Sequence, residues 1–194
     1  MNIPSFILHR MEKRADYMTK RVLPFLHHAK TILDVGSGNC FIAKRLIQAG
    51  KQVTAVDIKD QSLEPSVKVT VFDGKVLPFK NKSFDLGLLL TVMHHTPSPE
   101  KIFQEVARVS RDIIVIETSY RNILEKFFIV LFDSLLNRQP RFFWNSYRLD
   151  SDWKNFFDTQ GYKVLKTEQY VDMQGVPYFH PLYYLAPKVL KSSQ

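Results

Sequence analysis

The sequence predicts an α/β protein with a doubly wound, mostly parallel seven-stranded sheet whose last strand is antiparallel. Short runs of aliphatic and β-branched residues alternate with segments of helical periodicity between residues 31 and 118. The run FDLGLLLTV at 84–92 is almost entirely apolar, which is typical of a central parallel strand buried on both faces. Two strand-like runs near the C-terminus, joined by a short connection, predict a closing antiparallel pair.

Each predicted element follows from its spacing and its end signals. The predicted strands are short apolar runs, at residues 31–36, 52–58, 67–72, 84–92, 112–118, 162–171 and 178–188. The predicted helices have apolar residues three or four positions apart, at residues 3–28, 40–50, 99–110, 122–136 and 151–159. Gly50 ends the second helix and Pro99 begins the third, as these residue types commonly do.

Composition and charge narrow the class of protein. A chain of 194 residues with 45% hydrophobic and 24% charged residues predicts one globular domain over 1–194. The net charge of +8 would allow attraction to nucleic acid, anionic headgroups or acidic small molecules, but the basic residues are scattered. The single cysteine excludes an intrachain disulfide, and no signal peptide or membrane span is evident, so a cytoplasmic location is expected.

The segment TILDVGSGNC at 31–40 joins a strand, a glycine turn and a helix start. Gly36 and Gly38 would let backbone N–H groups approach a ligand at the helix N-terminus. Asp57 ends the next strand, where a carboxylate can accept hydrogen bonds from ribose hydroxyls. Together these features predict a ligand that contains adenosine.

Other nucleotide and catalytic motifs fit less well. A dinucleotide turn needs a third glycine where this chain has Phe41, and neither a P-loop nor a nucleophile elbow is present. The histidines and the one cysteine do not have the spacing of a zinc site, so no metal is expected.

The chain resembles the class I S-adenosylmethionine-dependent methyltransferases of the small-molecule type, whose turn reads LDVGxGxG. The resemblance extends from about Arg14 to Lys188. It rests on the segments ILDVGSGN, VTAVDI, FDGKVLPFKNKSFDLGLLLTVMHH, IIVIE and HPLYYLAPK, in that order. It implies a Rossmann-like methyltransferase fold, S-adenosylmethionine as the cofactor, and a small-molecule acceptor as the partner.

The resemblance also implies a set of cofactor-binding residues, namely Arg14, Asp34, Gly36, Ser37, Gly38, Asp57, Ile58, Asp73, Gly74 and Thr91. Asp34 and the turn at 36–38 would hold the methionine portion, and Asp57 would hold the ribose. Ile58 would pack on the adenine, and Asp73, beside Gly74, would accept from its exocyclic amine.

Two further residues would complete the cofactor site according to the same resemblance. Thr91 would lie near the sulfonium and Arg14 near the cofactor carboxylate. Cys40 departs from the usual G-x-G-x-G turn. Its Cβ could crowd the cofactor, and a thiol at a helix N-terminus can have a lowered pKa, but the favoured interpretation is a small apolar residue that the helix start tolerates.

Methyl transfer requires mainly alignment, so a base is needed only if the acceptor must lose a proton. His94 and His95 follow the fourth strand, at the edge of the sheet where ligands bind in such folds. Either histidine could serve as the base near neutral pH, or one could pack in the loop while the other only hydrogen-bonds the acceptor.

The segment 120–160 is expected to form a lid over the acceptor, and the N-terminal helix within residues 1–28 would face it. The lid contains many aromatic residues, and Trp144, Tyr147 and Trp153 are the candidate acceptor contacts. The same aromatics could instead fill the core. Arg138, Arg141 and Arg148 lie among them. They keep nucleic acid open as a less favoured partner, and residues 122–141 keep a peripheral membrane contact open.

Two classes of function remain open from the sequence. The first is transfer of a methyl group to a small, lipophilic or aromatic acceptor at O, N or C, with RNA as a less favoured acceptor. The second is a non-catalytic module with the same fold that binds the cofactor or a partner.

Overall fold

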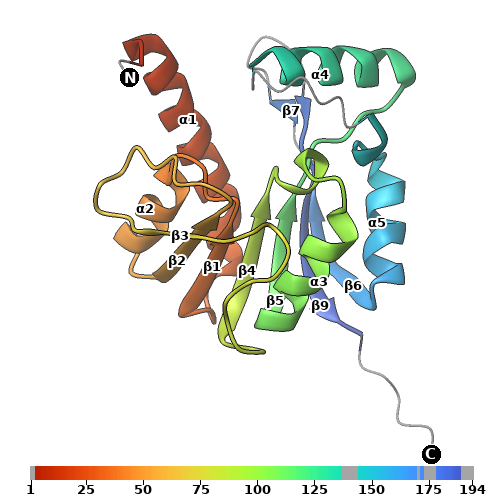
Figure 1. Ribbon diagram of the computed structural model, residues 1–194. Coiled ribbons are helices and arrows are strands. Elements are labelled where there is room, and N and C mark those ends of the chain that lie inside the picture. The colour runs from red at the N-terminus through yellow and green to blue at the C-terminus, as the bar shows by residue number, and fades with distance from the viewer. Residues whose placement is uncertain (1–2, 137–143, 170, 173–177, 189–194) are drawn as a thin grey trace, which may run out of the picture.

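A computed structural model describes residues 3–136, 144–169, 171–172 and 178–188, and a seven-stranded sheet forms its centre (Figure 1). The strands lie in the order β3-β2-β1-β4-β5-β9-β6. Their bounds are β1 Thr31–Val35, β2 Gln52–Asp57, β3 Val69–Val71, β4 Phe84–Leu90, β5 Ser110–Ile116, β6 Tyr162–Glu168 and β9 Leu182–Pro187. Six strands of this sheet run in one direction and β9 runs in the opposite direction between β5 and β6, which confirms the predicted fold class.

The helices also follow the sequence pattern, with differences at their ends. Their bounds are α1 Ser5–Val22, α2 Phe41–Gln48, α3 Pro99–Val109, α4 Ile123–Leu136 and α5 Asp150–Thr159. Three 3₁₀ turns add η1 Leu23–Phe25, η2 Met93–His95 and η3 Trp144–Ser146. The first helix ends at Val22, earlier than expected, because Pro24 has no N–H to continue the α-helical bonding.

The predicted last strand, 178–188, is divided in two. Tyr178–Phe179 (β8) pairs with Val171–Asp172 (β7) in a separate two-stranded sheet, and β9 begins only at Leu182. Pro181 separates the two pieces. It cannot donate a hydrogen bond to a ladder, which explains the break at this point.

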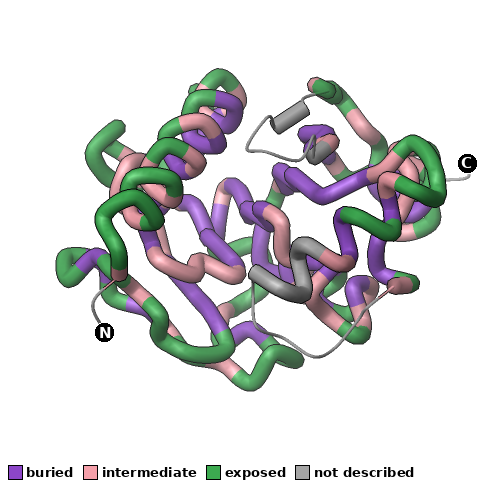
Figure 2. The backbone as a smooth tube through the Cα atoms, turned by 90° about the horizontal axis from the view of Figure 1, so that it is seen from above, coloured by how far each residue is buried: buried purple, intermediate pink, exposed green. Residues whose placement is uncertain are grey.

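Helices cover both faces of the main sheet because strand side chains alternate between the faces. Met18 of α1 and Leu46 of α2 pack with Ile32 and Leu88 on one face. On the other face the α3 and α5 helices supply a second core cluster, which contains Phe103, Val106, Trp153, Phe156 and Phe157 together with strand residues. Seen from above, the buried segments lie inside a rim of exposed helices and loops (Figure 2).

The carboxyl ends of the parallel strands meet at one edge of the sheet, and α4 lies across that edge (Figure 1). The turns after β1, β2, β3, β4 and β5 therefore converge there. Ligands of open α/β sheets bind outside this edge, so the fold brings the predicted site residues to the expected place.

Candidate active site

The glycine turn between β1 and α2 is held against β2 by backbone hydrogen bonds. The N–H groups of Gly36 and Ser37 donate to the Val56 carbonyl at 2.9 and 3.1 Å. Gly36 has a φ of 73°, and a Cβ at this position would lie 2.6 Å from Cγ2 of Val92. Any side chain here would collide with the turn that follows β4, so only glycine fits.

Cys40 precedes α2 in the left-handed conformation, with a φ of 64°. Its side chain is fully buried and packs with Ala43, Ala55 and Val69. Burial raises the pKa of the Cys40 thiol, so the expectation of a thiol with a lowered pKa at the helix N-terminus is wrong. The side chain behaves as a small apolar residue in a position whose φ favours glycine.

We expect Cys40 to resist thiol reagents in the folded protein, because the thiol is buried and the thiolate is the reactive form. Reaction with 5,5′-dithiobis(2-nitrobenzoate) at pH 8 should be on the order of a hundredfold slower in buffer than in 6 M guanidinium. The denatured chain serves as the control and should release one thiol equivalent. Rapid reaction of the native protein would contradict the packing of this side chain.

Asp34 lies near the end of β1 with only 3% of its surface exposed. Among the described residues, no hydrogen bond or ion pair reaches its carboxyl group. Burial, and then the charge of Asp57, raise the pKa of Asp34 to about 7. A buried carboxyl group without a protein partner is suited to receive a cationic group from a ligand.

Asp57 lies at the end of β2 and uses both carboxylate oxygens on the adjoining turns. Oδ2 accepts from the Gly38 N–H at 2.9 Å, and Oδ1 accepts from the Ile58 N–H at 2.7 Å. These bonds fix the carboxylate directly beside the glycine turn. Each oxygen retains capacity for a further donor, such as a hydroxyl group.

The predicted adenine-side residues also lie together. Ile58 is 63% exposed although it is apolar, and a Cβ on Gly74 would lie 3.2 Å from its Cγ2. Asp73 accepts from the N–H groups of Val76 and Lys75 at 3.0 and 2.8 Å, and these bonds, that from Val76 foremost, lower the pKa of Asp73. The turn after β3 is thereby shaped next to an exposed aliphatic side chain.

Thr91 brings the N-terminal helix to the site. Its N–H donates to the Ile116 carbonyl at 2.6 Å, and its φ of 59° turns the chain sharply out of β4. Arg14 of α1 donates from Nη2 to Oγ1 of Thr91 at 3.1 Å. The two residues that the resemblance assigned to the methionine end of the cofactor are therefore in direct contact.

The turn after β4 contains the two candidate bases in different environments. His94 is 2% exposed, and its Nδ1 hydrogen-bonds Oε2 of Glu117. The His95 ring lies over the His94 ring with a centroid separation of 4.0 Å and is partly exposed. Tyr147 covers His94 from the lid segment at 5.0 Å.

Glu117 is a site residue that our sequence reasoning did not identify. It is fully buried just beyond β5, and Oε1 accepts from the N–H groups of Val92 and Met93 at 2.9 and 2.6 Å. The available signal was an acid at the end of an apolar strand, IIVIE, where a buried carboxylate needs a partner. Its partner lies 23 residues earlier in the chain.

The three acceptor-side candidates differ in placement. Trp153 is fully buried in the core and stacks on Phe157, so core packing rather than a ligand contact accounts for it. Tyr147 is 5% exposed and lines a cavity of about 490 Å³. Trp144 is partly exposed, and Lys126 Nζ lies 4.8 Å from its ring centroid. Arg138, Arg141, Phe142 and Phe143 lie outside the described residues.

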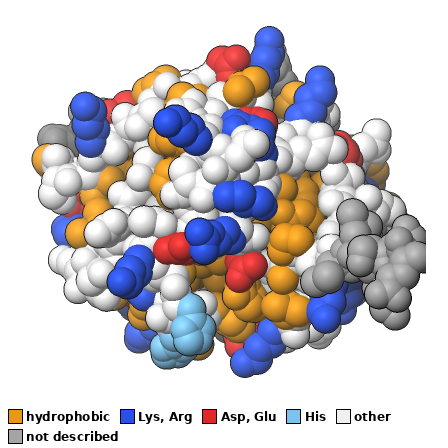
Figure 3. All heavy atoms as spheres, turned by 90° about the horizontal axis from the view of Figure 1, so that it is seen from below, with side chains coloured by type: hydrophobic (Ala, Val, Ile, Leu, Met, Phe, Trp, Pro, Cys, Tyr) orange, Lys and Arg blue, Asp and Glu red, His pale blue; other side chains and the backbone are white. Residues whose placement is uncertain are grey.

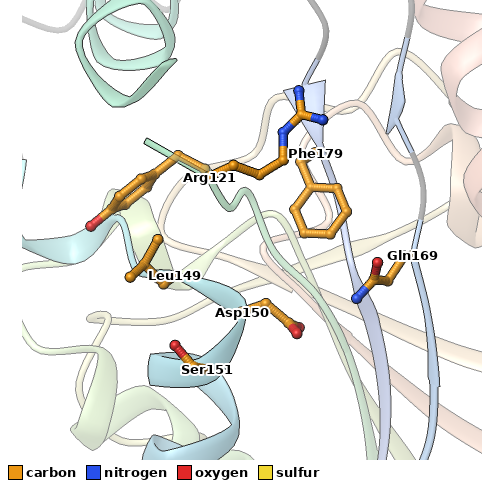
Figure 4. A pocket seen from close by; sticks show the side chains of 7 residues that line it. Arg121, Leu149, Asp150, Ser151, Gln169 and Phe179 are labelled. Atoms are coloured by element: carbon orange, nitrogen blue, oxygen red, sulfur yellow. The ribbon is translucent and has the colours of Figure 1, made fainter. Parts of the chain in front are cut away.

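A second cavity of about 510 Å³ opens between the start of the lid and the ends of β6 and β8 (Figure 4). Figure 4 shows side chains of α5 and of the segments before α4 and after β6 around it. Its labelled lining residues are Arg121, Leu149, Asp150, Ser151, Gln169 and Phe179. The segment 120–160 therefore contributes to both cavities.

Surface features bear on the two alternative partners. On the face seen from below, Lys and Arg side chains are spread out rather than gathered into a stripe (Figure 3). On α4, four exposed apolar residues lie close together, namely Ile123, Leu124, Phe127 and Phe128. Among the described helices, none has both the length and the apolar character needed to cross a membrane.

Comparison with known proteins agrees with this geometry. Residues 33–112 match the family model described as "Methyltransferase domain". The chain is 28% identical over 90 residues to a ubiquinone biosynthesis O-methyltransferase of Idiomarina loihiensis, a match that covers 41% of this chain and 37% of the relative. It is 30% identical over 113 residues to norajmaline N-methyltransferase of Rauvolfia serpentina, which covers 48% and 38%, respectively. The matches thus span less than two-fifths of these relatives' own length.

A solved structure has the same fold. Magnesium protoporphyrin IX methyltransferase from Synechocystis PCC 6803, solved with bound SAH, superposes with a TM-score of 0.65 at 14% identity, covering 96% of this chain and 90% of that one. The matching domain contains the glycine turn, Asp57 and the turn after β4. By its match to the methyltransferase-domain model over residues 33–112, its curated relatives and its fold, the chain is similar to the class I S-adenosylmethionine-dependent methyltransferases.

Proposed function

We propose that this protein transfers a methyl group from S-adenosylmethionine to a small, lipophilic or aromatic acceptor. The observation that carries the proposal is the convergence of Asp34, the glycine turn and Asp57 at the carboxyl edge of the sheet. Two features of these residues fit the cofactor. Among the described residues, no hydrogen bond or ion pair reaches the Asp34 carboxyl group, and the Asp57 carboxylate lies beside the glycine turn with capacity for a further donor.

In the proposal, each residue around the glycine turn contacts a different part of the cofactor. Asp34 and the turn at 36–38 hold the amino acid end of the cofactor, with Arg14 and Thr91 on the opposite side. Asp57 accepts from the ribose hydroxyls. Ile58 and Gly74 form the adenine surface, and Asp73 accepts from the exocyclic amine with the oxygen capacity that its turn leaves over.

The bound cofactor supplies an activated methyl group on a sulfonium, so the protein must mainly align the acceptor and exclude water. An acceptor O–H or N–H must also lose its proton. The histidine pair at the end of β4 is the candidate for this role, and the partly exposed His95 is the ring that an acceptor can reach. The buried His94 ring packs against the His95 ring and holds it in place.

The lid supports a lipophilic or aromatic acceptor. Tyr147 lines a cavity next to the histidine pair, and exposed apolar residues cover the outer side of α4. The two relatives are named as an O-methyltransferase of ubiquinone biosynthesis and as norajmaline N-methyltransferase. A small-molecule acceptor is favoured for this chain, and the acceptor atom is open between O, N and C.

Contact with a membrane surface through residues 122–141 is a further part of this proposal. The described portion of that segment exposes Ile123, Leu124, Phe127 and Phe128 on a helix above the site. Such a face can lie in the interfacial layer, where a lipophilic acceptor would also concentrate.

The test of the proposed function is calorimetric titration of the reduced protein with S-adenosylmethionine and with S-adenosylhomocysteine. Wild type should bind both saturably, and Asp57→Ala should weaken binding on the order of a hundredfold, because it removes the ribose acceptor and releases the turn. Asp158→Ala is the matched control, since Asp158 pairs with Lys188 far from the cradle. An acceptor screen of lipophilic phenols and amines follows.

Each outcome of that titration has a defined meaning. Failure of wild type to bind either ligand would overturn the proposal. Binding without turnover on any acceptor would favour the alternative, a cofactor-binding module that lacks catalysis. RNA stays the less favoured acceptor, because the basic residues are scattered along the sequence.

A further inference from the structure

The Glu117 side chain contacts several residues of the turn after β4. Its side chain is fully buried, and its two oxygens serve different partners. Oε1 accepts from the backbone N–H groups of Val92 and Met93, and Oε2 bonds Nδ1 of His94. A single carboxylate thus holds three consecutive residues of the turn after β4.

The turn after β4 also contacts residues of the proposed cofactor site. Val92 lies against Gly36, where it leaves no room for a Cβ, and Thr91 accepts from Arg14 of α1. Thr91 also adopts a left-handed φ of 59°, which is costly for a β-branched residue and requires support from its surroundings. The support comes from the bond to Ile116 on one side and from Glu117 on the other.

We propose that Glu117 is the positioning residue of this site. It touches neither cofactor nor acceptor. It fixes residues 91–95 so that Thr91 and Val92 complete the cofactor cradle and His95 faces the acceptor. The inference rests on the proposed function for its consequences on ligand binding, whereas the anchoring itself can be measured without any ligand.

The two oxygens give Glu117 two separable effects. The Oε1 bonds hold the backbone of the turn. The Oε2 bond sets the tautomer of His94, because a carboxylate accepts and Nδ1 must then bear the hydrogen, which leaves the lone pair on Nε2. The other groups around this ring are His95, Tyr147 and His180, and His180 in turn lies near Arg14 and Arg21.

A pair of substitutions separates these effects. In Glu117→Gln, the amide oxygen can still accept from Val92 and Met93, but the amide nitrogen donates toward His94 and requires Nδ1 to accept. We expect affinity for S-adenosylhomocysteine within about threefold of wild type, with the His94 tautomer inverted in ¹⁵N-detected spectra. In Glu117→Ala, affinity should fall about tenfold or more, and the Val92 and Met93 amides should exchange on the order of a hundredfold faster.

Controls distinguish positioning from a general loss of stability. Phe157→Leu trims the core between α5 and the sheet, where the Phe157 ring contacts Phe103, Trp153 and Tyr183, so it should lower stability without changing ligand affinity or the His94 spectrum. The proposal is overturned if Glu117→Ala leaves the two amides protected, or if Phe157→Leu weakens ligand binding as much as Glu117→Ala does. If wild type binds no ligand, the proposed function fails, and the exchange rates and the tautomer still decide the role of Glu117.

Discussion

Replacing His94 by phenylalanine should lower the free energy of unfolding by about 1 to 3 kcal/mol, the cost of leaving a buried hydrogen-bonding group without its partner. Phenylalanine retains a ring of similar shape against Tyr147 and His95, so the lost packing is small. What changes is the environment of Glu117, whose Oε2 loses the His94 imidazole as a partner while the Glu117 side chain stays fully buried. Urea unfolding followed by far-UV circular dichroism measures the difference.

His28→Phe is the matched control for this prediction, because His28 is exposed and has no buried carboxylate beside it. It should change stability by less than about 0.5 kcal/mol, as substitutions at the surface commonly do. A loss below about 1 kcal/mol in His94→Phe would mean that water or a shift of the turn satisfies Glu117 without the imidazole.

The sheet could be predicted because the sequence patterns that specify its strands and helices are local and occur many times along the chain. Apolar strand runs and helical spacing recur along the chain, and parallel strands joined by right-handed crossovers leave few arrangements. The predicted bounds were wrong at the end of the first helix and in the last strand, and in both places a proline interrupts the backbone hydrogen bonds. Pro24 converts the end of α1 into a 3₁₀ turn, and Pro181 divides the final strand, yet neither proline changes the hydrophobic pattern that the prediction used.

The convergence of the candidate cofactor residues could be predicted for a similar reason, since Asp34, Asp57 and Thr91 all lie at strand ends that the fold brings to one edge. Contacts between distant segments could not be predicted. The bond from Arg14 to Thr91 joins residues 77 positions apart, and nothing local in either segment specifies it. The hydrogen bond between His94 and Glu117 could not be predicted for the same reason, because the two residues are 23 positions apart.

Burial was the other quantity that the sequence could not supply. Trp153 and Tyr147 lie in one aromatic segment, but the helical phase of α5 turns Trp153 fully into the core, whereas Tyr147 reaches a cavity. At Cys40 the helix start suggested an activated thiol. The packing of its side chain beneath the turn reverses the direction of the pKa shift, because desolvation dominates there.

Asp34→Asn should stabilise the protein, and the gain should depend on pH. The pKa of Asp34 is raised from 3.8 to about 7 in the folded protein, so the folded state keeps a proton that the unfolded state releases between these values. Stability therefore falls as the pH rises from about 4 to 7. The cost of about three pKa units is about 4 kcal/mol above pH 7, and asparagine removes it.

Thermal and urea unfolding at pH 4.5 and pH 8 measure this dependence. The variant should match wild type closely at the lower pH and exceed it clearly at the higher one. Asp85→Asn is a control of opposite sign, because hydrogen bonds from the backbone of Thr31 and Lys30 lower the pKa of Asp85. It should lose stability at pH 8. A gain in Asp34→Asn that is equal at both pH values would contradict the assigned ionisation.

The same carboxyl group should make cofactor affinity depend on pH in the opposite sense. A ligand ammonium beside Asp34 favours the ionised carboxylate, so binding below pH 7 must first remove a proton. Affinity for S-adenosylhomocysteine should fall nearly tenfold for each pH unit below about 6.5, and calorimetry in buffers of different ionisation enthalpy should detect the released proton. Asp34→Asn should bind weakly with no such dependence. A stabilising substitution that abolishes binding would show that this position is kept for the ligand at the expense of the fold.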